Sequence, residues 1–180
     1  MALDSFLHPW RGVALRHIPS GSSRGVFDDT YAGYSKLNHW NEARTPTFYF
    51  ACDIAVVLAE YGRHIDEELP GGEPERLSRA VWKVPIALDR LIDLRDPAAV
   101  DAIGLPPLND WIGDRDRTQA TVRFLRHHVD VQGLLVPSMG FLDDHRKWNV
   151  VVYLDRIDPR VAFSTPEFVR HMVLEAIGGD

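Results

Sequence analysis

Two residues of the chain stand out by their chemical type and their setting. Tyr49 lies in the aromatic segment 47–51, which follows a proline and favours a β-strand. Asp53 can then cap a helix that carries Glu60. Because Glu60 follows four apolar residues, helical spacing puts its carboxylate on or near the buried face, where an unpaired charge is costly unless it has a function. The strand and the helix could bring Tyr49 and Glu60 together.

Two further residues could take part in the same chemistry. Ser138 directly follows the apolar segment 133–137, which is typical of a buried strand. His39 lies in a segment of loop-like composition, and the local environment of its imidazole sets its charge near neutral pH. Each of these residues also has a purely structural interpretation, since Tyr49 could be a core residue, Ser138 a strand end and His39 a loop histidine.

Other familiar kinds of site are weakly supported. The acidic segments 114–116 and 143–145 lack a second set of ligands at a fixed spacing, so we expect solvated turns there and no metal. Cys52 has no neighbouring base to activate it. The chain contains neither Gly-x-Gly-x-x-Gly nor a P-loop, so a dinucleotide would not be bound in the Rossmann manner.

Composition narrows the class of protein further. The 180 residues are 45% hydrophobic, which is enough for the core of a single domain spanning residues 1–180. The net charge is −6, so neither direct nucleic-acid binding nor membrane-surface binding is expected. The single cysteine excludes an intrachain disulfide, and the chain shows no signal peptide and no membrane-spanning segment. We therefore expect a cytoplasmic protein.

The elements that must position these residues alternate along the chain. Strands are expected at residues 47–51, 78–84, 88–94, 133–137 and 148–154. Helices are expected after Asp53, at 97–104, at 117–127 and after Thr165, and loops at 14–38 and 67–75. This order predicts an α+β (mixed α/β) fold, with a central, partly antiparallel sheet flanked by helices.

The segment around the candidate residues resembles the RES domain, a family named for an arginine, a glutamate and a serine that recur in it. Residues 37–41 (Leu-Asn-His-Trp-Asn) are similar to the family's Gly-Gly-Arg-Trp-Asn. Residues 45–51 (Thr-Pro-Thr-Phe-Tyr-Phe-Ala) and Glu60 are similar to its Pro-x-x-Tyr-x-Ala and downstream glutamate. The order and spacing of these pieces are more specific than any one of them.

Two later segments extend the resemblance. Residues 91–97 with 103–105 are similar to the family's Leu-Asp-Leu stretch before a short helix. Residues 118–119, followed by 133–138 (Gly-Leu-Leu-Val-Pro-Ser), are similar to its Gly-x-x-x-Pro-Ser ending. Together with the first segment they cover roughly residues 10–155.

The resemblance implies a fold like that of ADP-ribosyltransferases, NAD⁺ as substrate, and a cognate antitoxin of helix-turn-helix (Xre-like) type that blocks the site. It implies catalytic roles for Glu60, His39 and Tyr49, and NAD⁺ binding by Arg11, His39, Trp40, Tyr49 and Ser138. In these roles Glu60 stabilises the positive charge that develops on the ribose, and Tyr49 faces the nicotinamide ring. Arg11 and Ser138 would contact the phosphates.

One departure from the family pattern bears on activity. His39 stands where the family usually has the arginine before Trp-Asn. The order His39, Tyr49, Glu60 resembles the triad of diphtheria-toxin-type ADP-ribosyltransferases, which favours an active enzyme. Alternatively, loss of the arginine weakens phosphate binding and lowers or abolishes activity.

Three functions follow from this resemblance. The favoured one is a toxin that cleaves the nicotinamide–ribose bond of NAD⁺ and transfers ADP-ribose to a protein, as a mono-ADP-ribosyltransferase. The runner-up is an NAD⁺ glycohydrolase or phosphorylase that depletes cellular NAD⁺. The third is an inactive RES-like binding module. A toxin acting on RNA is disfavoured, because the acidic chain lacks a basic stripe.

Overall fold

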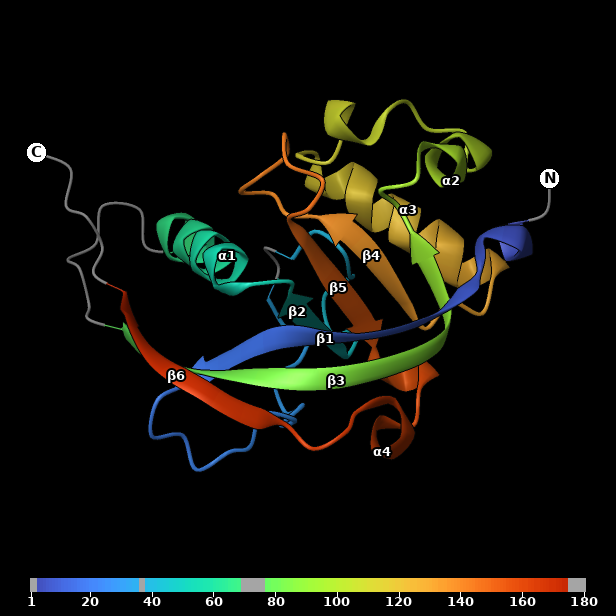
Figure 1. The fold of residues 1–180 in the computed structure, drawn as a ribbon. Helices are drawn as coiled ribbons and strands as arrows, with labels where there is room; N and C mark the ends of the chain where they lie inside the picture. Colours follow the sequence, from blue (N-terminus) through green and yellow to red (C-terminus); the bar gives the residue numbers. More distant parts are fainter. Residues whose placement is uncertain (1–2, 36–37, 69–76, 175–180) are drawn as a thin grey trace, which may run out of the picture.

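A sheet of six strands forms the centre of the computed structural model, which describes residues 3–35, 38–68 and 77–174 (Figure 1). The strands are β1 (His8–Pro19), β2 (Thr47–Ala51), β3 (Leu77–Asp93), β4 (Gly133–Pro137), β5 (Trp148–Tyr153) and β6 (Glu167–Leu174). The α-helices are α1 (Ile54–Glu68), α2 (Pro97–Ala102), α3 (Arg115–His128) and α4 (Pro159–Ala162). Short 3-10 turns are η1 (Leu3–Phe6), η2 (Leu108–Asp110) and η3 (Leu154–Arg156). The expected α+β class and the partly antiparallel sheet are confirmed.

Five of the strands close into a ring. Strand β1 pairs antiparallel with β3, and β3 pairs parallel with β4. Strand β4 pairs with β5 and β5 with β2, both antiparallel. A single pair, Leu15 with Ala51, joins β2 to β1 and completes the ring within the described residues. Strand β6 adds to β3 outside the ring.

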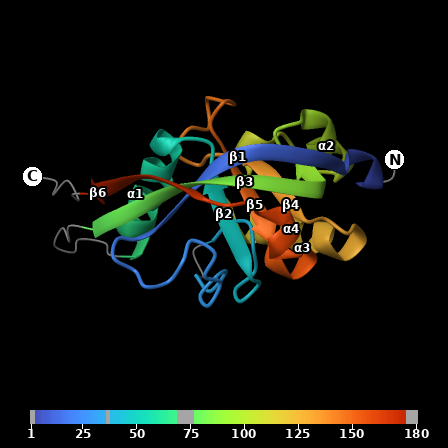
Figure 2. The ribbon, with the colours of Figure 1, turned by 60° about the horizontal axis from the view of Figure 1, so that its bottom comes forward.

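The helices cover different parts of this ring. Helix α3 lies behind β4 and β5, and Val122 and Leu125 pack there against Val151 (Figures 1 and 2). Strands β1 and β3 cross the opposite face of β2, β4 and β5, as Figure 2 shows from a second direction. Helix α1 packs at the junction of β1 and β2 through Val56 and Val57. The candidate site therefore lies where the ring meets α1.

Most of the expected elements are present close to their predicted positions. The strands at 47–51, 133–137 and 148–154 correspond to β2, β4 and β5, and the helices at 97–104 and 117–127 correspond to α2 and α3. Asp53 caps α1 as predicted, since its Oδ1 accepts a hydrogen bond from the Val56 N–H at 3.0 Å. The loop expected at 67–75 lies mostly outside the described residues, and its first two residues belong to the end of α1.

Two expectations about elements are wrong, and two of the expected strands are one. The segment 14–38 is not loop throughout, because residues 14–19 belong to β1. The strands expected at 78–84 and 88–94 are one continuous strand, β3. The helix expected after Thr165 is strand β6, because the free edge of β3 at residues 77–83 takes up this segment as an antiparallel partner.

Candidate active site

The carboxylate of Glu60 is the best-connected polar group of the site. Its Oε1 accepts hydrogen bonds from the Ser138 hydroxyl at 2.7 Å, the Met139 backbone N–H at 2.9 Å and the Asn149 amide at 3.0 Å. Its Oε2 lies 3.2 Å from Arg63 Nη2, and the side chain is only 18% exposed. Four donors around one half-buried carboxylate fix its orientation.

The fold explains why these donors meet at one place. Glu60 lies on α1, whereas Ser138 and Met139 follow β4 and Asn149 lies on the neighbouring strand β5. Gly140 lets the loop after β4 approach the helix, because a Cβ at this position would lie 2.7 Å from the Cβ of Ala59. The loop after β4 is thus pressed against the turn of α1 that carries Glu60.

Tyr49 lies on the same face of the sheet as Asn149, since both belong to the alternating set of β2 and β5 that faces α3. Its hydroxyl donates to Asn41 Oδ1 at 2.6 Å and accepts from the Trp40 N–H at 3.2 Å. Burial raises the pKa of Tyr49 well above its usual value, so the phenol stays protonated at neutral pH. Tyr49 is therefore a positioning or stacking group and not a base.

The loop that carries His39 and Trp40 is fixed at several points. Gly33 has a φ of 75°, and a Cβ there would collide with the Thr45 carbonyl, so glycine is required where these loop segments touch. Asn41 donates to the Gly33 carbonyl at 3.3 Å. His39 is 6% exposed and Trp40 3% exposed, so both are held within the fold.

A cavity of about 140 Å³ joins these residues. Its walls include four of the six site residues expected from the sequence, namely His39, Trp40, Tyr49 and Glu60. Ser138 is fully buried and reaches the site through its hydrogen bond to Glu60. The indole of Trp40 packs against Trp111 in the core, with ring centroids 6.2 Å apart, so much of this side chain supports the wall from behind.

Arg11 is the expected site residue that the structure does not bring to this cavity. It lies on β1, its Nη2 is 2.8 Å from Asp89 Oδ1, and its Nη1 donates to the Leu88 carbonyl at 2.7 Å. The side chain is 59% exposed and does not line the cavity. In this structure Arg11 therefore contacts Asp89 and Leu88 and does not reach the residues that line the cavity.

The structure supplies other basic and aromatic groups in its place. His17 on β1 and Tyr61 and Arg63 on α1 line the cavity. Arg79 Nε donates to His17 Nδ1 at 3.0 Å, which assigns the His17 proton to Nε2, and the His17 and Tyr61 rings lie 4.8 Å apart. The Arg79 guanidinium also lies 4.7 Å from the centroid of the Tyr61 ring. One wall of the cavity is therefore cationic and aromatic.

Sequence reasoning missed several of these residues, although two left a signal. Arg63 is three residues after Glu60, a spacing that brings side chains together on a helix. Asn149 is a polar residue in an otherwise apolar strand, and such a buried amide calls for a partner. His17 and Arg79 left no signal, because their contact joins residues 62 positions apart.

Within the ranges that the structure describes, no group of three or more His, Cys, Asp or Glu side chains is arranged to hold a metal ion. The same ranges contain no helix with both the length and the apolar character needed to cross a bilayer.

Comparisons with known proteins agree with this picture. The family model of the RES domain matches residues 9–172. A chain of the crystal structure of the M. tuberculosis MbcT–MbcA toxin–antitoxin complex has a similar fold, with a TM-score of 0.66 and 19% sequence identity. The match covers 96% of this chain and 89% of that chain. A comparison with curated proteins gives no significant match.

Proposed function

Because the chain belongs to the RES domain family, we propose that it is the toxin of a bacterial toxin–antitoxin pair and an enzyme that consumes NAD⁺. The proposed reaction cleaves the nicotinamide–ribose bond and transfers ADP-ribose to a protein acceptor. The observation that carries this proposal is the oriented carboxylate of Glu60 in a cavity that it shares with Tyr49 and His39. We further propose that residues 1–180 form one domain.

The chemistry of the reaction requires such a carboxylate. When the bond between ribose C1 and the nicotinamide nitrogen breaks, its electron pair leaves with nicotinamide, which becomes neutral. The ribose is left with oxocarbenium character, which a fixed negative charge stabilises. The acceptor atom then bonds to C1 and loses a proton to the carboxylate of Glu60 or the imidazole of His39.

The two oxygens of Glu60 suit different tasks. Oε1 already accepts three hydrogen bonds, which hold the carboxylate in place. Among the residues that the structure describes, Oε2 contacts Arg63, so it is the atom with capacity for a ribose hydroxyl. A hydrogen bond that strengthens as positive charge develops raises turnover as well as affinity.

The remaining walls of the cavity fit the rest of the nicotinamide half. Tyr49 offers an aromatic surface whose hydroxyl is anchored by Asn41, so its ring can be packed against nicotinamide without losing orientation. Two lining residues can face phosphate oxygens, because His17 presents its Nε2–H and Arg63 its guanidinium, and they would replace the contact first expected from Arg11.

A partner protein is part of the proposal. The similar structure comes from a toxin–antitoxin complex, and we propose a cognate antitoxin for this chain, of helix-turn-helix type, acting in the cytoplasm. An antitoxin that covers the cavity lined by Tyr49 and Glu60 would block the reaction.

The test is nicotinamide release from NAD⁺ by purified protein, with and without cell lysate and with and without phosphate. Glu60→Gln keeps the shape of the side chain but removes its charge, and we expect it to lower release by about 100-fold or more. Glu42→Gln is the matched control, because Glu42 pairs with Arg123 on the surface. It should leave the rate unchanged.

The outcomes separate the possible reactions. Release that requires lysate and leaves ADP-ribose on a protein supports the transferase. Release without lysate identifies an NAD⁺ hydrolase, or a phosphorylase if phosphate is required. No release under any condition refutes the enzymatic proposal and leaves an inactive binding module.

A further inference from the structure

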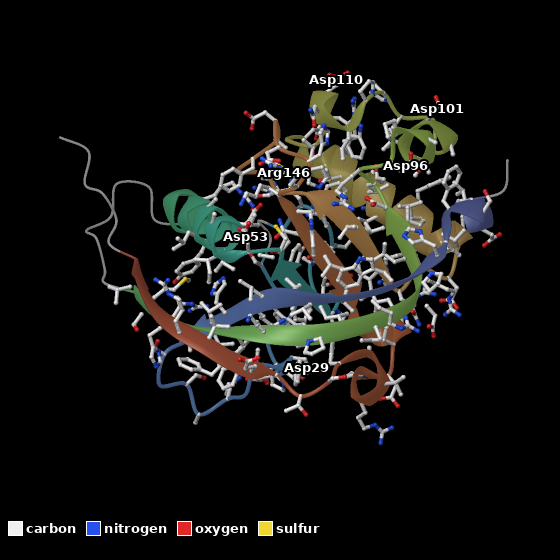
Figure 3. The ribbon with its side chains drawn as sticks, in the orientation of Figure 1. Asp29, Asp53, Asp96, Asp101, Asp110 and Arg146 are labelled. Atoms are coloured by element: carbon white, nitrogen blue, oxygen red, sulfur yellow. The ribbon has the colours of Figure 1, made fainter. Side chains whose placement is uncertain are left out.

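A second cavity, of about 330 Å³, adjoins the first, because Pro137 at the end of β4 lines both of them. It lies among the turn after β3, helix α2 and the loop around η2. Figure 3 labels Asp96 and Asp101 on the α2 side and Asp110 on the η2 side of this region. The reaction described above makes no use of this space.

We propose that this second cavity binds the adenosine end of the dinucleotide, an inference that rests on the proposed function. The first cavity, at about 140 Å³, is smaller than the roughly 300–1,000 Å³ typical of sites for drug-sized ligands. A dinucleotide that places its nicotinamide ribose beside Glu60 must therefore extend beyond that cavity. Pro137 lines both cavities, so the substrate would pass it on the way from one cavity to the other.

The walls of the second cavity suit a flat heteroaromatic base. Most of them are apolar, and the apolar lining residues are Leu94, Pro97, Val100, Leu105, Pro107, Leu108 and Pro137. Asp101 and Asn109 add a carboxylate and an amide to this lining. Adenine has an amino donor and ring-nitrogen acceptors, so a carboxylate and an amide can fix its orientation between apolar walls.

The second cavity also has a cation in its wall. Arg95 lines the second cavity, as does Pro137. Its guanidinium is held by Asp93 through two hydrogen bonds, Nε to Oδ1 at 2.9 Å and Nη2 to Oδ2 at 2.7 Å. A guanidinium fixed in this way presents its remaining N–H groups in a defined direction, which suits the pyrophosphate that links the two halves of the substrate.

The protein acceptor is the competing occupant of this cavity, and the geometry disfavours it. The acceptor must reach ribose C1 beside Glu60, which lines the first cavity and not the second. The base of the substrate needs only to be joined to the reacting ribose through the pyrophosphate.

The test is isothermal titration of the full-length protein with two probes, AMP and nicotinamide mononucleotide. Asp101→Trp puts an indole into the wall of the second cavity at an exposed position of α2. Asp110→Trp is the matched control, because Asp110 is exposed on the neighbouring η2 and does not line the cavity. We expect Asp101→Trp to weaken AMP binding by at least about tenfold. Asp110→Trp should leave AMP binding unchanged, and neither variant should alter binding of nicotinamide mononucleotide.

The outcomes distinguish the subsite from the reaction. If AMP binds equally to wild type and Asp101→Trp, or does not bind to wild type, the adenosine site is overturned even when NAD⁺ is cleaved. If both tryptophan variants weaken AMP equally, the effect is not local and the site is also overturned. If AMP binding follows the expected pattern but wild type releases no nicotinamide, the nucleotide site stands and the proposed reaction is wrong.

Discussion

Replacing Ser138 by alanine tests whether the hydrogen bonds around Glu60 do what the proposed reaction requires. The Ser138 hydroxyl donates to Glu60 Oε1 at 2.7 Å and accepts from the Gly140 N–H at 3.2 Å, within a fully buried residue. The alanine variant removes both contacts and leaves two donors on Oε1, from Met139 and Asn149. It therefore loosens the carboxylate without removing it.

The contacts set the expected magnitude. A hydrogen bond to a charged group contributes about 1.5–3 kcal/mol to the free energy of unfolding. For a chain of this length, each kcal/mol corresponds to about 2–4 °C in the melting temperature, so we expect Ser138→Ala to melt several degrees below wild type. If orientation of Glu60 limits the rate, kcat should fall by about 10- to 100-fold, which corresponds to about 1.4–2.7 kcal/mol.

The assay combines thermal melting with nicotinamide release, and includes a double variant. Ser164→Ala is the control, because Ser164 is exposed and far along the chain, and its melting temperature should stay within about 2 °C of wild type. In the Glu60→Gln background, Ser138→Ala should lower the rate little further, since both changes affect one unit. Equal loss of rate in both backgrounds would refute the idea that Ser138 acts through Glu60.

Other changes test the surroundings of the site. Gly140→Ala puts a Cβ within 2.7 Å of the Cβ of Ala59, so it should lower the free energy of unfolding by about 1–3 kcal/mol in urea titration; an unchanged midpoint would contradict the close approach. Tyr49→Phe removes the hydroxyl partner of Asn41 and should cost about 1–3 kcal/mol by the same measurement, whereas a neutral effect would mean that the hydroxyl does not anchor the loop. Burial raises the pKa of Asp53, but hydrogen bonds from Lys147 and from the first turn of α1 outweigh it and hold that pKa below 3.8. The stability this carboxylate adds is therefore present above pH 3.8 and lost as the pH falls through its folded-state pKa. Asp53→Asn should be less stable than wild type at pH 7, and the difference should shrink as the pH falls below 3.8, as measured by denaturation over a pH series; a difference that stays constant into acid would contradict this account.

The parts of the fold that could be predicted are those set by local pattern. Strands β4 and β5 are short apolar runs, and α2 and α3 begin at aspartates that cap them, Asp96 and Asp114. In each case the residues that define the element are neighbours in the sequence. Tyr49 and Glu60 could be placed together for the same reason, since only one tight connection separates β2 from α1.

The parts that could not be predicted depend on distant partners. The strands expected at 78–84 and 88–94 leave out Pro85, yet β3 continues through it. The Pro85 carbonyl accepts from the Ser164 N–H and so points away from β1, which means that the missing N–H of this proline removes no bond of the β1–β3 ladder. Likewise, the spacing of Phe168 and Met172 fits a helix, but the segment forms β6 because β3 offers an edge more than 80 residues earlier in the chain.

Arg11 does not reach the cavity for a related reason. Its place in the sequence suits a phosphate contact, but strand register decides where it lies, and Arg11 is opposite Ala87. That register sends its guanidinium to Asp89. His17, six residues later on the same strand, is the residue of β1 that reaches the cavity.

The strand pairings of the ring differ in length, and the pairing of β1 with β2 consists of the single pair Leu15–Ala51. Local opening costs less free energy where fewer backbone bonds hold two strands together, so β1 and β2 can part while the other ladders stay intact. His17 and Tyr49 lie two residues from this pair, on opposite strands, and both line the reaction cavity. Local opening between β1 and β2 would widen the cavity. A bulky substrate could then enter, and its products leave, without global unfolding.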